Sequence, residues 1–330
     1  MTQQDCDSCE LMVTIRCTTY NHEPYIRQCL DGFLMQKTTF RFEAVVHDDA
    51  STDQTANIIR EYAEKYPDII KPIYETENQY SKHDGSIGRI MNAHMHGKYI
   101  AMCEGDDYWT DPLKLQKQVD FLEAHPDFSM CFTNAEVVFD GLVAIDSKKK
   151  LFNHLQSRQY SGYEIFKKWS VPTASCVFRN YFKEGQVQPI DNRFIFGDII
   201  LFLWLAELGN LWCINEKTVV YRRNKGGATF KKIDYNKRIN HYLAVKEHFG
   251  VKYEKLTNMF IAITYIKAFI TSGSITLSTK VLQDVINSGK YFPLFIRYFL
   301  PVSFKSLSNK IKLNIHERID QYHLCKLPKI

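Results

Sequence analysis

Blocks of apolar residues alternate with polar, loop-forming segments along the first 125 residues, and each block predicts a strand or a helix. Short apolar runs rich in β-branched residues at 11–18, 42–46, 69–74 and 99–103 predict buried strands. The segments between them carry apolar residues at helical spacing. Strands that alternate with helices in this way predict an α/β fold with a mostly parallel, doubly wound sheet flanked by helices.

The fourth of these strands runs directly into an acidic cluster within the stretch KYIAMCEGDDYWTDP. Glu104, Asp106 and Asp107 follow the strand at once, and ligands bind outside the carboxyl ends of strands in open α/β sheets. Carboxylates this close repel one another unless a cation, protons or solvent relieve them, so a hard divalent metal is one explanation. A solvated acidic turn is the other. Asp111 and Pro112 then predict the N-cap and first residue of a helix that extends to His125.

Two further acidic positions stand out by their place in the pattern. Asp48 and Asp49 end the second strand. Asp198 begins a nearly all-apolar stretch, 199–205, which predicts a buried helix. An acid at this place favours the helix dipole, but burial against apolar neighbours would also make it a stronger base. From about residue 234 onward the pattern predicts helices without strands.

Composition and charge add bounds to this picture. Apolar content of 45% in 330 residues is typical of a folded protein. The nine cysteines form no compact framework, which favours reduced thiols and a cytoplasmic location. The net charge of +5 hides a basic region, because residues 231–330 hold 17 Lys plus Arg against 6 Asp plus Glu. We find no signal peptide and no apolar run of the ~18 residues that a membrane span needs.

The apolar, aromatic segment 291–304 in the basic region permits two interpretations. It could rest on the cytoplasmic face of a membrane beside anionic lipid, as a peripheral contact. Packing on the preceding α/β domain or in a homodimer is the more common use of such a segment. No partner among nucleic acids is expected.

The motifs of the first half resemble those of the family 2 glycosyltransferases, of GT-A fold. The segments that carry the resemblance are VTIRCTTYNHEPYIRQCL, EAVVHDDASTDQT, the run from Gly88 to Ile100, and EGDDYW. The resemblance covers roughly residues 11–230 and implies a catalytic domain at 1–230, followed by a basic helical region at 231–330. No GxGxxG or P-loop is present, which disfavours an ordinary dinucleotide or ATP site.

The resemblance also implies roles for individual residues. Asp198 would be the general base, although Gly197 replaces the Glu that precedes this Asp in the family. Mg²⁺ or Mn²⁺ would bind Asp106, the last acid of a D-x-D motif whose first acid is here Glu104, and Asp107 would help to form the metal site. Contacts to the nucleotide sugar are implied for seven residues: Thr18, Tyr20, Asp49, Arg89, Glu104, Asp106 and Arg222.

Together these observations predict an inverting glycosyltransferase. Its donor would be a nucleotide sugar, with UDP as the expected nucleotide, and its acceptor a hydroxyl of a glycan or of a lipid-linked carrier in cell-surface polysaccharide synthesis. Two alternatives stay open. A sugar nucleotidyltransferase would need a glycine-rich phosphate loop, which residues 16–24 lack, and a non-catalytic sugar-binding or nucleotide-binding protein could retain the same fold.

Overall fold

The computed structural model describes residues 10–139, 142–143, 151–223 and 234–272, and the chain forms two compact units. The first unit comprises Met1–Ile165, Ser170–Asn192 and Leu201–Lys231, and the second comprises Phe166–Trp169, Arg193–Ile200 and Lys232–Ile330. The segment 291–304, with its predicted membrane or packing contact, lies outside the described residues.

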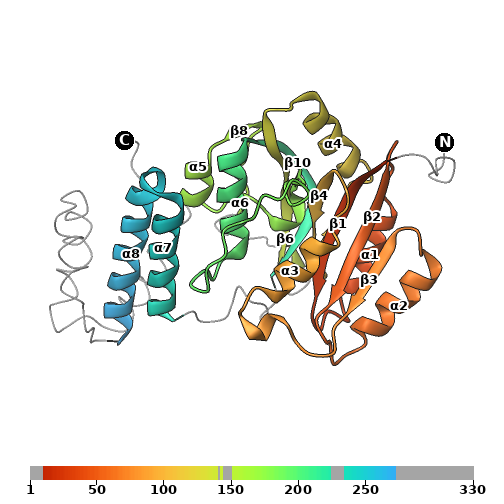
Figure 1. Ribbon diagram of the computed structural model, residues 1–330, viewed down its shortest axis with the longest axis horizontal. Coiled ribbons are helices and arrows are strands. Elements are labelled where there is room, and N and C mark those ends of the chain that lie inside the picture. Colours follow the sequence, from red (N-terminus) through yellow and green to blue (C-terminus); the bar gives the residue numbers. More distant parts are fainter. Residues whose placement is uncertain (1–9, 140–141, 144–150, 224–233, 273–330) are drawn as a thin grey trace. The chain divides into compact units, whose positions relative to one another are not determined.

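One mixed sheet organises the first unit (Figure 1). Its strands follow the order β3-β2-β1-β4-β9-β6-β10-β5, with β7 paired to β6 and β8 to β10. The strand bounds are β1 Leu11–Thr19, β2 Arg41–Asp48, β3 Ile70–Tyr74, β4 Tyr99–Met102, β5 Tyr108–Trp109, β6 Phe128–Phe139, β7 Leu142–Val143, β8 Arg158–Tyr160, β9 Val177–Arg179 and β10 Asn210–Arg223.

The predicted α/β sheet with flanking helices is confirmed, and its parallel part is the N-terminal half. Strands β3, β2, β1 and β4 pair in parallel. Strand β9 then lies antiparallel between β4 and β6, while β6 and β10 again pair in parallel. The repeating strand-helix pattern ends before β9, so it contains no signal for the antiparallel strands.

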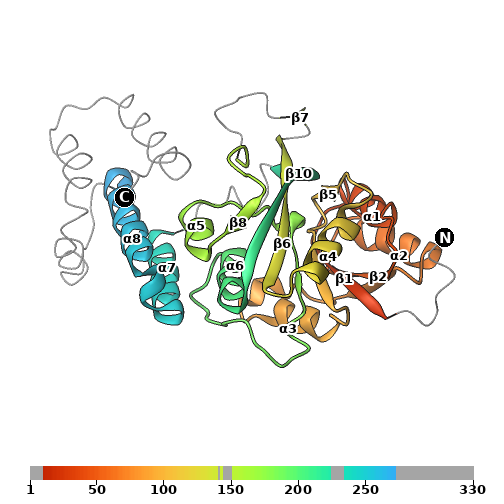
Figure 2. The ribbon, with the colours of Figure 1, turned by 90° about the horizontal axis from the view of Figure 1, so that it is seen from above.

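Helices connect the strands where the apolar spacing predicts them. Within the first 125 residues they are α1 Ile26–Leu34, α2 Thr55–Lys65, α3 Ser86–Ala93 and α4 Lys114–Ala124, followed by α5 Gly162–Lys167 and α6 Gly197–Leu208. Seen from above, α1 and α2 lie beside strands β1 and β2 (Figure 2).

The predicted start of α4 is wrong by two residues. Leu113 is the N-cap residue, with no side-chain cap bond, and Asp111 instead accepts a hydrogen bond from the Leu113 N–H at 2.9 Å. Asp111 therefore closes a turn in front of the helix. Its carboxylate is also paired with Lys117 at 2.8 Å.

A buried lysine lies next to the strand that follows the acidic cluster. Lys114 is fully buried, donates to the Gln118 Oε1 atom at 2.8 Å, and has its ammonium 4.2 Å from the ring centroid of Trp109. Trp109 in turn donates to the carbonyl of Ala174 at 2.8 Å. Because burial disfavours the charged form, the pKa of Lys114 falls to about 8.

Six buried cysteines contribute to the core of the first unit. They are Cys17, Cys29, Cys103, Cys131, Cys176 and Cys213. The sulfur atoms of Cys29 and Cys103 are 4.0 Å apart, and burial raises the pKa of the Cys103 thiol to about 12. The described cysteines are free thiols, as the sequence predicts for them.

The described part of the second unit contains two complete helices, α7 Tyr235–Phe249 and α8 Val251–Ser272, besides the first turn of α6. Asp234 caps α7 by accepting from the N–H groups of Asn236 and Lys237. Gly250, at φ +67°, separates the helices, and the rings of Tyr242 and Phe260 pack between them at 5.1 Å. Within the described residues, neither of these helices nor any other combines the length and the apolar character of a membrane span.

The buried lysine predicts a specific pH dependence of stability. The folded chain releases the Lys114 proton near pH 8, whereas the unfolded chain holds it until about pH 10.5. The unfolded state therefore binds more protons between these values, and Lys114 adds stability as the pH rises. We expect the free energy of unfolding of the wild type, relative to that of Lys114→Met, to increase by about 2 kcal/mol from about pH 7.5 to about pH 9.5.

Urea unfolding of the two proteins at several pH values measures this difference, and the contributions of the cysteines and tyrosines cancel in the comparison. A difference that stays constant over the range would show that the Lys114 pKa is not lowered.

Candidate active site

The carboxyl ends of β1, β2 and β4 meet at one edge of the sheet because these strands are parallel neighbours. Backbone hydrogen bonds continue beyond the strands themselves. The Gly105 N–H donates to the Thr18 carbonyl at 3.1 Å, and the Asp49 N–H donates to the Thr19 carbonyl at 3.0 Å. Thr18, Asp49 and the acidic cluster are therefore brought together, as predicted from their positions at strand ends.

Side chains brace the loop after β1 against the loop after β2. Asn21 lies in the left-handed region at φ 53°, and its Oδ1 accepts from the Thr52 N–H at 2.8 Å. The His22 N–H donates to the Thr55 hydroxyl at 2.8 Å. The Glu23 N–H donates to an Asp53 carboxylate oxygen at 3.1 Å. These polar loops are consequently fixed at the edge where a ligand would bind.

The last acid of the cluster is tied to the end of the final strand. Asp107 is 3% exposed, and its Oδ1 accepts the backbone N–H of Arg222 at 2.7 Å. The Arg222 guanidinium donates to the Asp106 carbonyl at 2.7 Å and to Gln28, and it lies 4.4 Å from the ring centroid of Tyr108. Arg222 therefore lies at the acidic cluster, where its guanidinium holds the backbone carbonyl of Asp106 by a hydrogen bond.

The three carboxylates have different electrostatic surroundings. Burial raises the pKa of Asp107 well above its usual range, and the negative charges of Asp106 and Glu104 raise it further. Glu104 faces a cation, since its charge raises the pKa of the Arg16 guanidinium against the larger lowering by burial. The Asp106 carboxylate, half-buried, makes no hydrogen bond or ion pair with the rest of the chain's described part. Asp106 therefore keeps its acceptor oxygens for a ligand.

A glycine between Glu104 and Asp106 admits the side chain of His22. A Cβ on Gly105 would lie 2.5 Å from Thr19 Cγ2 and 2.9 Å from His22 Nδ1, so only glycine fits there. His22 Nδ1 is buried without a hydrogen-bond partner in the structure as described. Burial lowers the His22 pKa, although the Asp106 charge acts in the opposite direction.

These observations fit a divalent cation held mainly by Asp106. Such a cation relieves the mutual repulsion of adjacent carboxylate charges. Among the described residues, no group of three or more His, Cys, Asp and Glu side chains is arranged to hold a metal. Mg²⁺ characteristically takes one or two carboxylates and completes its shell with water and substrate phosphate oxygens, so the donor set is suited to a metal that arrives with a diphosphate.

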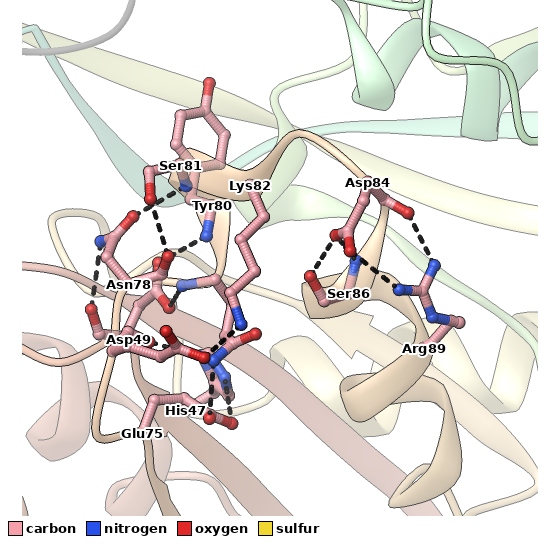
Figure 3. Close-up of polar contacts among 12 residues, drawn as sticks. His47, Asp49, Glu75, Asn78, Tyr80, Ser81, Lys82, Asp84, Ser86 and Arg89 are labelled. Atoms are coloured by element: carbon pink, nitrogen blue, oxygen red, sulfur yellow. Dashed lines mark hydrogen bonds and ion pairs between the residues drawn. The ribbon is translucent and has the colours of Figure 1, made fainter.

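Asp49 has an additional role that its sequence position did not reveal. Its two carboxylate oxygens accept the backbone N–H groups of Gln79 at 2.6 Å and Tyr80 at 3.0 Å, and its carbonyl accepts from the Asn78 side chain. Figure 3 shows this group together with His47 and Glu75, whose side chains lie 3.3 Å apart. Asp49 therefore fixes the turn after β3, and its predicted contact with the nucleotide stays a prediction.

Two other predicted residues lie at the surface. Tyr20 is 45% exposed at the end of β1. Arg89, on α3, donates to the Asp84 carbonyl at 2.6 Å and pairs with its carboxylate at 3.4 Å, a group drawn apart from Asp49 in Figure 3. No hydrogen bond in the described residues joins Arg89 to the acidic cluster.

Asp198 belongs to the second unit, at the start of α6. It is half-buried, and burial raises the pKa of its carboxyl. Both features are those the sequence predicts for an acid that begins an apolar helix. Its role as a base stays a prediction.

Sequence reasoning missed several residues that build this site. The polar loop after β1 contains Asn21 and His22, and Gln28 follows it in α1. Their closeness to the end of a strand could have marked them as candidate site residues. Asn78 and Gln79 had none, because a bond from a carboxylate to a backbone N–H thirty residues away has no local sequence pattern.

Known proteins share parts of this sequence and structure. An uncharacterized protein of Mycobacterium tuberculosis is 37% identical over 210 residues, which are 63% of this chain and 58% of that protein. The chain thus covers less than two thirds of that relative's length.

Two solved structures share the fold. TarS of S. aureus in complex with UDP-GlcNAc has a TM-score of 0.57 at 17% identity, over 95% of this chain and 90% of that one. A mannosyltransferase from Pyrobaculum calidifontis, in complex with GDP-Man and Mn²⁺, has a TM-score of 0.50 at 16% identity, over 96% and 86%.

The family model of glycosyl transferase family 2 matches residues 14–185. This range contains most of β1, all of β2 and β4, and the loops that follow them, including the acidic cluster, and it covers more than half of the chain. The chain therefore belongs to glycosyl transferase family 2.

Proposed function

We propose that this protein transfers one sugar from a UDP-linked donor to a hydroxyl of a glycan or lipid-linked acceptor, with inversion at the anomeric carbon. The observation that carries the proposal is the Asp106 carboxylate, which has no partner in the described chain although it stands where three parallel strands end. The UDP-GlcNAc bound to TarS, on a similar fold, supports the choice of donor.

The donor's diphosphate would bind beside Asp106, with the nucleoside over the ends of β1 and β2. Thr18, Tyr20 and Asp49 would line the nucleoside side, with Arg89 as a cation toward the base or phosphates. Mg²⁺ or Mn²⁺ held by Asp106, with Asp107 and Glu104 as neighbouring charges, would offset the charge that develops on the departing diphosphate. Arg222 would keep the acidic cluster in register with β10.

Asp198 would act as the general base. As the acceptor oxygen forms its bond to the anomeric carbon, the bond from that carbon to the diphosphate oxygen breaks, and the hydroxyl proton passes to the Asp198 carboxylate. Attack from the face opposite the leaving group inverts the configuration. Burial raises the pKa of Asp198, which makes its carboxylate a stronger base.

The acceptor would receive a single sugar at each encounter. The Gln-x-x-Arg-Trp signature of processive relatives is absent from the sequence, which favours one sugar per encounter. A lipid-linked acceptor would suit a peripheral membrane contact through residues 291–304, which stays a prediction together with the possible homodimer and the cytoplasmic location.

The metal role predicts the behaviour of Asp106→Asn. This change removes the one carboxylate of the cluster that has no partner in the described chain, so Mn²⁺-dependent UDP binding should be lost while the fold is retained. Isothermal titration calorimetry with UDP and Mn²⁺ measures it, with Asp120→Asn on the exposed side of α4 as the matched control. Unchanged UDP affinity in Asp106→Asn would refute the assignment.

The glycine between the acids predicts a steric effect at the same site. In Gly105→Ala the new Cβ would meet the side chains of Thr19 and His22 at 2.5 and 2.9 Å, so these side chains or the backbone that bears Asp106 must shift. We expect UDP affinity to fall by about tenfold or more, a loss of about 1.4 kcal/mol. Gly88→Ala is the control, because its Cβ would meet nothing within 4 Å. If both variants bind UDP as the wild type does, the Gly105 contact does not shape the site.

The proposed base predicts a different pattern for Asp198→Asn. We expect UDP and metal affinity to persist while turnover falls by roughly 10²-fold or more, the loss typical of removing a general base. Steady-state transfer assays and calorimetry on the same preparation measure both quantities. Near-normal turnover would move the role elsewhere, and Asp191→Asn tests the next acidic candidate in the same assay.

A further inference from the structure

We propose that α7 positions the general base, with His241 as the central positioning residue for the segment 193–197. This inference rests on the proposed role of Asp198. It assigns a catalytic purpose to a helix that the sequence places in a separate basic region.

The segment before Asp198 is grouped with α7 and α8. Arg193–Ile200 forms one compact unit with residues from Lys232 onward, whereas the later part of α6, from Leu201, is grouped with the sheet. The first turn of α6, which carries the proposed base, is therefore grouped with the described helices of the second unit.

His241 holds the backbone of this stretch. It is fully buried, and its Nδ1 atom accepts the Ile195 N–H at 3.4 Å. The ring of Phe196 meets the imidazole edge to face at 4.9 Å, and the ring of Phe194 lies at 6.0 Å. The imidazole thus contacts three of the five residues that precede Asp198.

The imidazole is neutral under physiological conditions. Burial, assisted by the charge of Arg238, lowers the His241 pKa to about 4. An Nδ1 atom that accepts requires the proton on Nε2, and Nε2 is buried without a hydrogen-bond partner in the described residues. The Nε2–H makes no hydrogen bond with the described residues. The described contacts of the imidazole with the segment are therefore its hydrogen bond with the Ile195 N–H and its packing against the rings of Phe194 and Phe196.

Other α7 side chains fasten the same segment at its periphery. Arg193 pairs with Glu247 at 2.5 Å, and the Arg238 guanidinium lies 5.6 Å from the Phe196 ring centroid. His248 contacts the ring of Phe194 at 5.2 Å. Residues 238, 241 and 248 recur at spacings of three and seven, so they share one face of the helix.

This anchoring matters because a base works only within hydrogen-bond reach of the proton that it takes, about 3 Å. A displacement of about 1 Å can cost 10²-fold in rate. A Cβ added to Gly197, directly before Asp198, would meet no atom of the described residues within 4 Å. The contacts of residues 194–196 with α7 therefore add to the packing of the buried α6 body in holding the start of the helix.

The experiment compares two His241 variants in the full chain. His241→Leu removes the acceptor but stays apolar, whereas the Oδ1 atom of His241→Asn can still accept the Ile195 N–H. We expect the leucine variant to lower kcat by about tenfold or more, with the donor KM and the calorimetric UDP affinity within about threefold of wild type, because the proposed donor residues lie in the first unit. The asparagine variant should recover most of the lost kcat.

A surface pair provides an independent test that does not depend on a buried substitution. Arg193→Glu and Glu247→Arg should each lower kcat, and the double variant, which restores opposite charges, should recover it. If His241→Leu fails to fold, this charge exchange decides the question.

Two outcomes separate the inference from the proposed function. Wild-type kcat in folded His241→Leu and in both single charge variants, with Asp198→Asn inactive, would overturn the positioning role and leave the base in place. An active Asp198→Asn would overturn the base itself, and the positioning inference with it.

Discussion

Three carboxylates within four residues, at the end of a buried strand, are the constraint on which the rest of this site depends. Each added negative charge raises the free energy of its neighbours unless a donor or cation offsets it. The fold supplies a backbone N–H from Arg222 to Asp107 and the guanidinium of Arg16 near Glu104. The Asp106 carboxylate receives no such hydrogen bond or ion pair from the described chain. The negative charge that the described chain leaves without a partner in this cluster is therefore that of Asp106.

A short strand and a long strand, far apart in sequence, pair next to this acidic cluster. Strand β5 follows Asp107 immediately and lies antiparallel to the end of β10 at Val219 and Val220. The hydrogen bond from the Arg222 N–H to Asp107 lies next to the last residue pair of the β5–β10 ladder. The Tyr108 ring packs against the Arg222 guanidinium. Loss of the bond would leave a buried carboxylate without its donor, which costs more than the bond itself contributes.

Features determined by short-range pattern could be predicted from the sequence, and those that arise from long-range bonds could not. The spacing of apolar residues predicts the strands and helices of the parallel half. It also predicts that the acidic cluster follows the end of a strand. The start of α4 was misplaced because Asp111 closes a turn rather than capping the helix, two arrangements with the same residue signature. The turn held by Asp49 and the anchoring of 193–197 by His241 depend on tertiary contacts between distant residues, and strand β9 has too few residues to show a period.

The buried cysteines have a consequence for how this fold can be followed in solution. Thiolates rather than thiols react with alkylating reagents, and Cys103, one residue before Glu104, is fully buried with a pKa raised to about 12. It can be modified only while the strand beneath the acidic cluster is open. The alkylation rate of Cys103 therefore reports how often this strand opens locally. A ligand that binds the carboxylates would stabilise the closed state and lower the alkylation rate without contacting the sulfur.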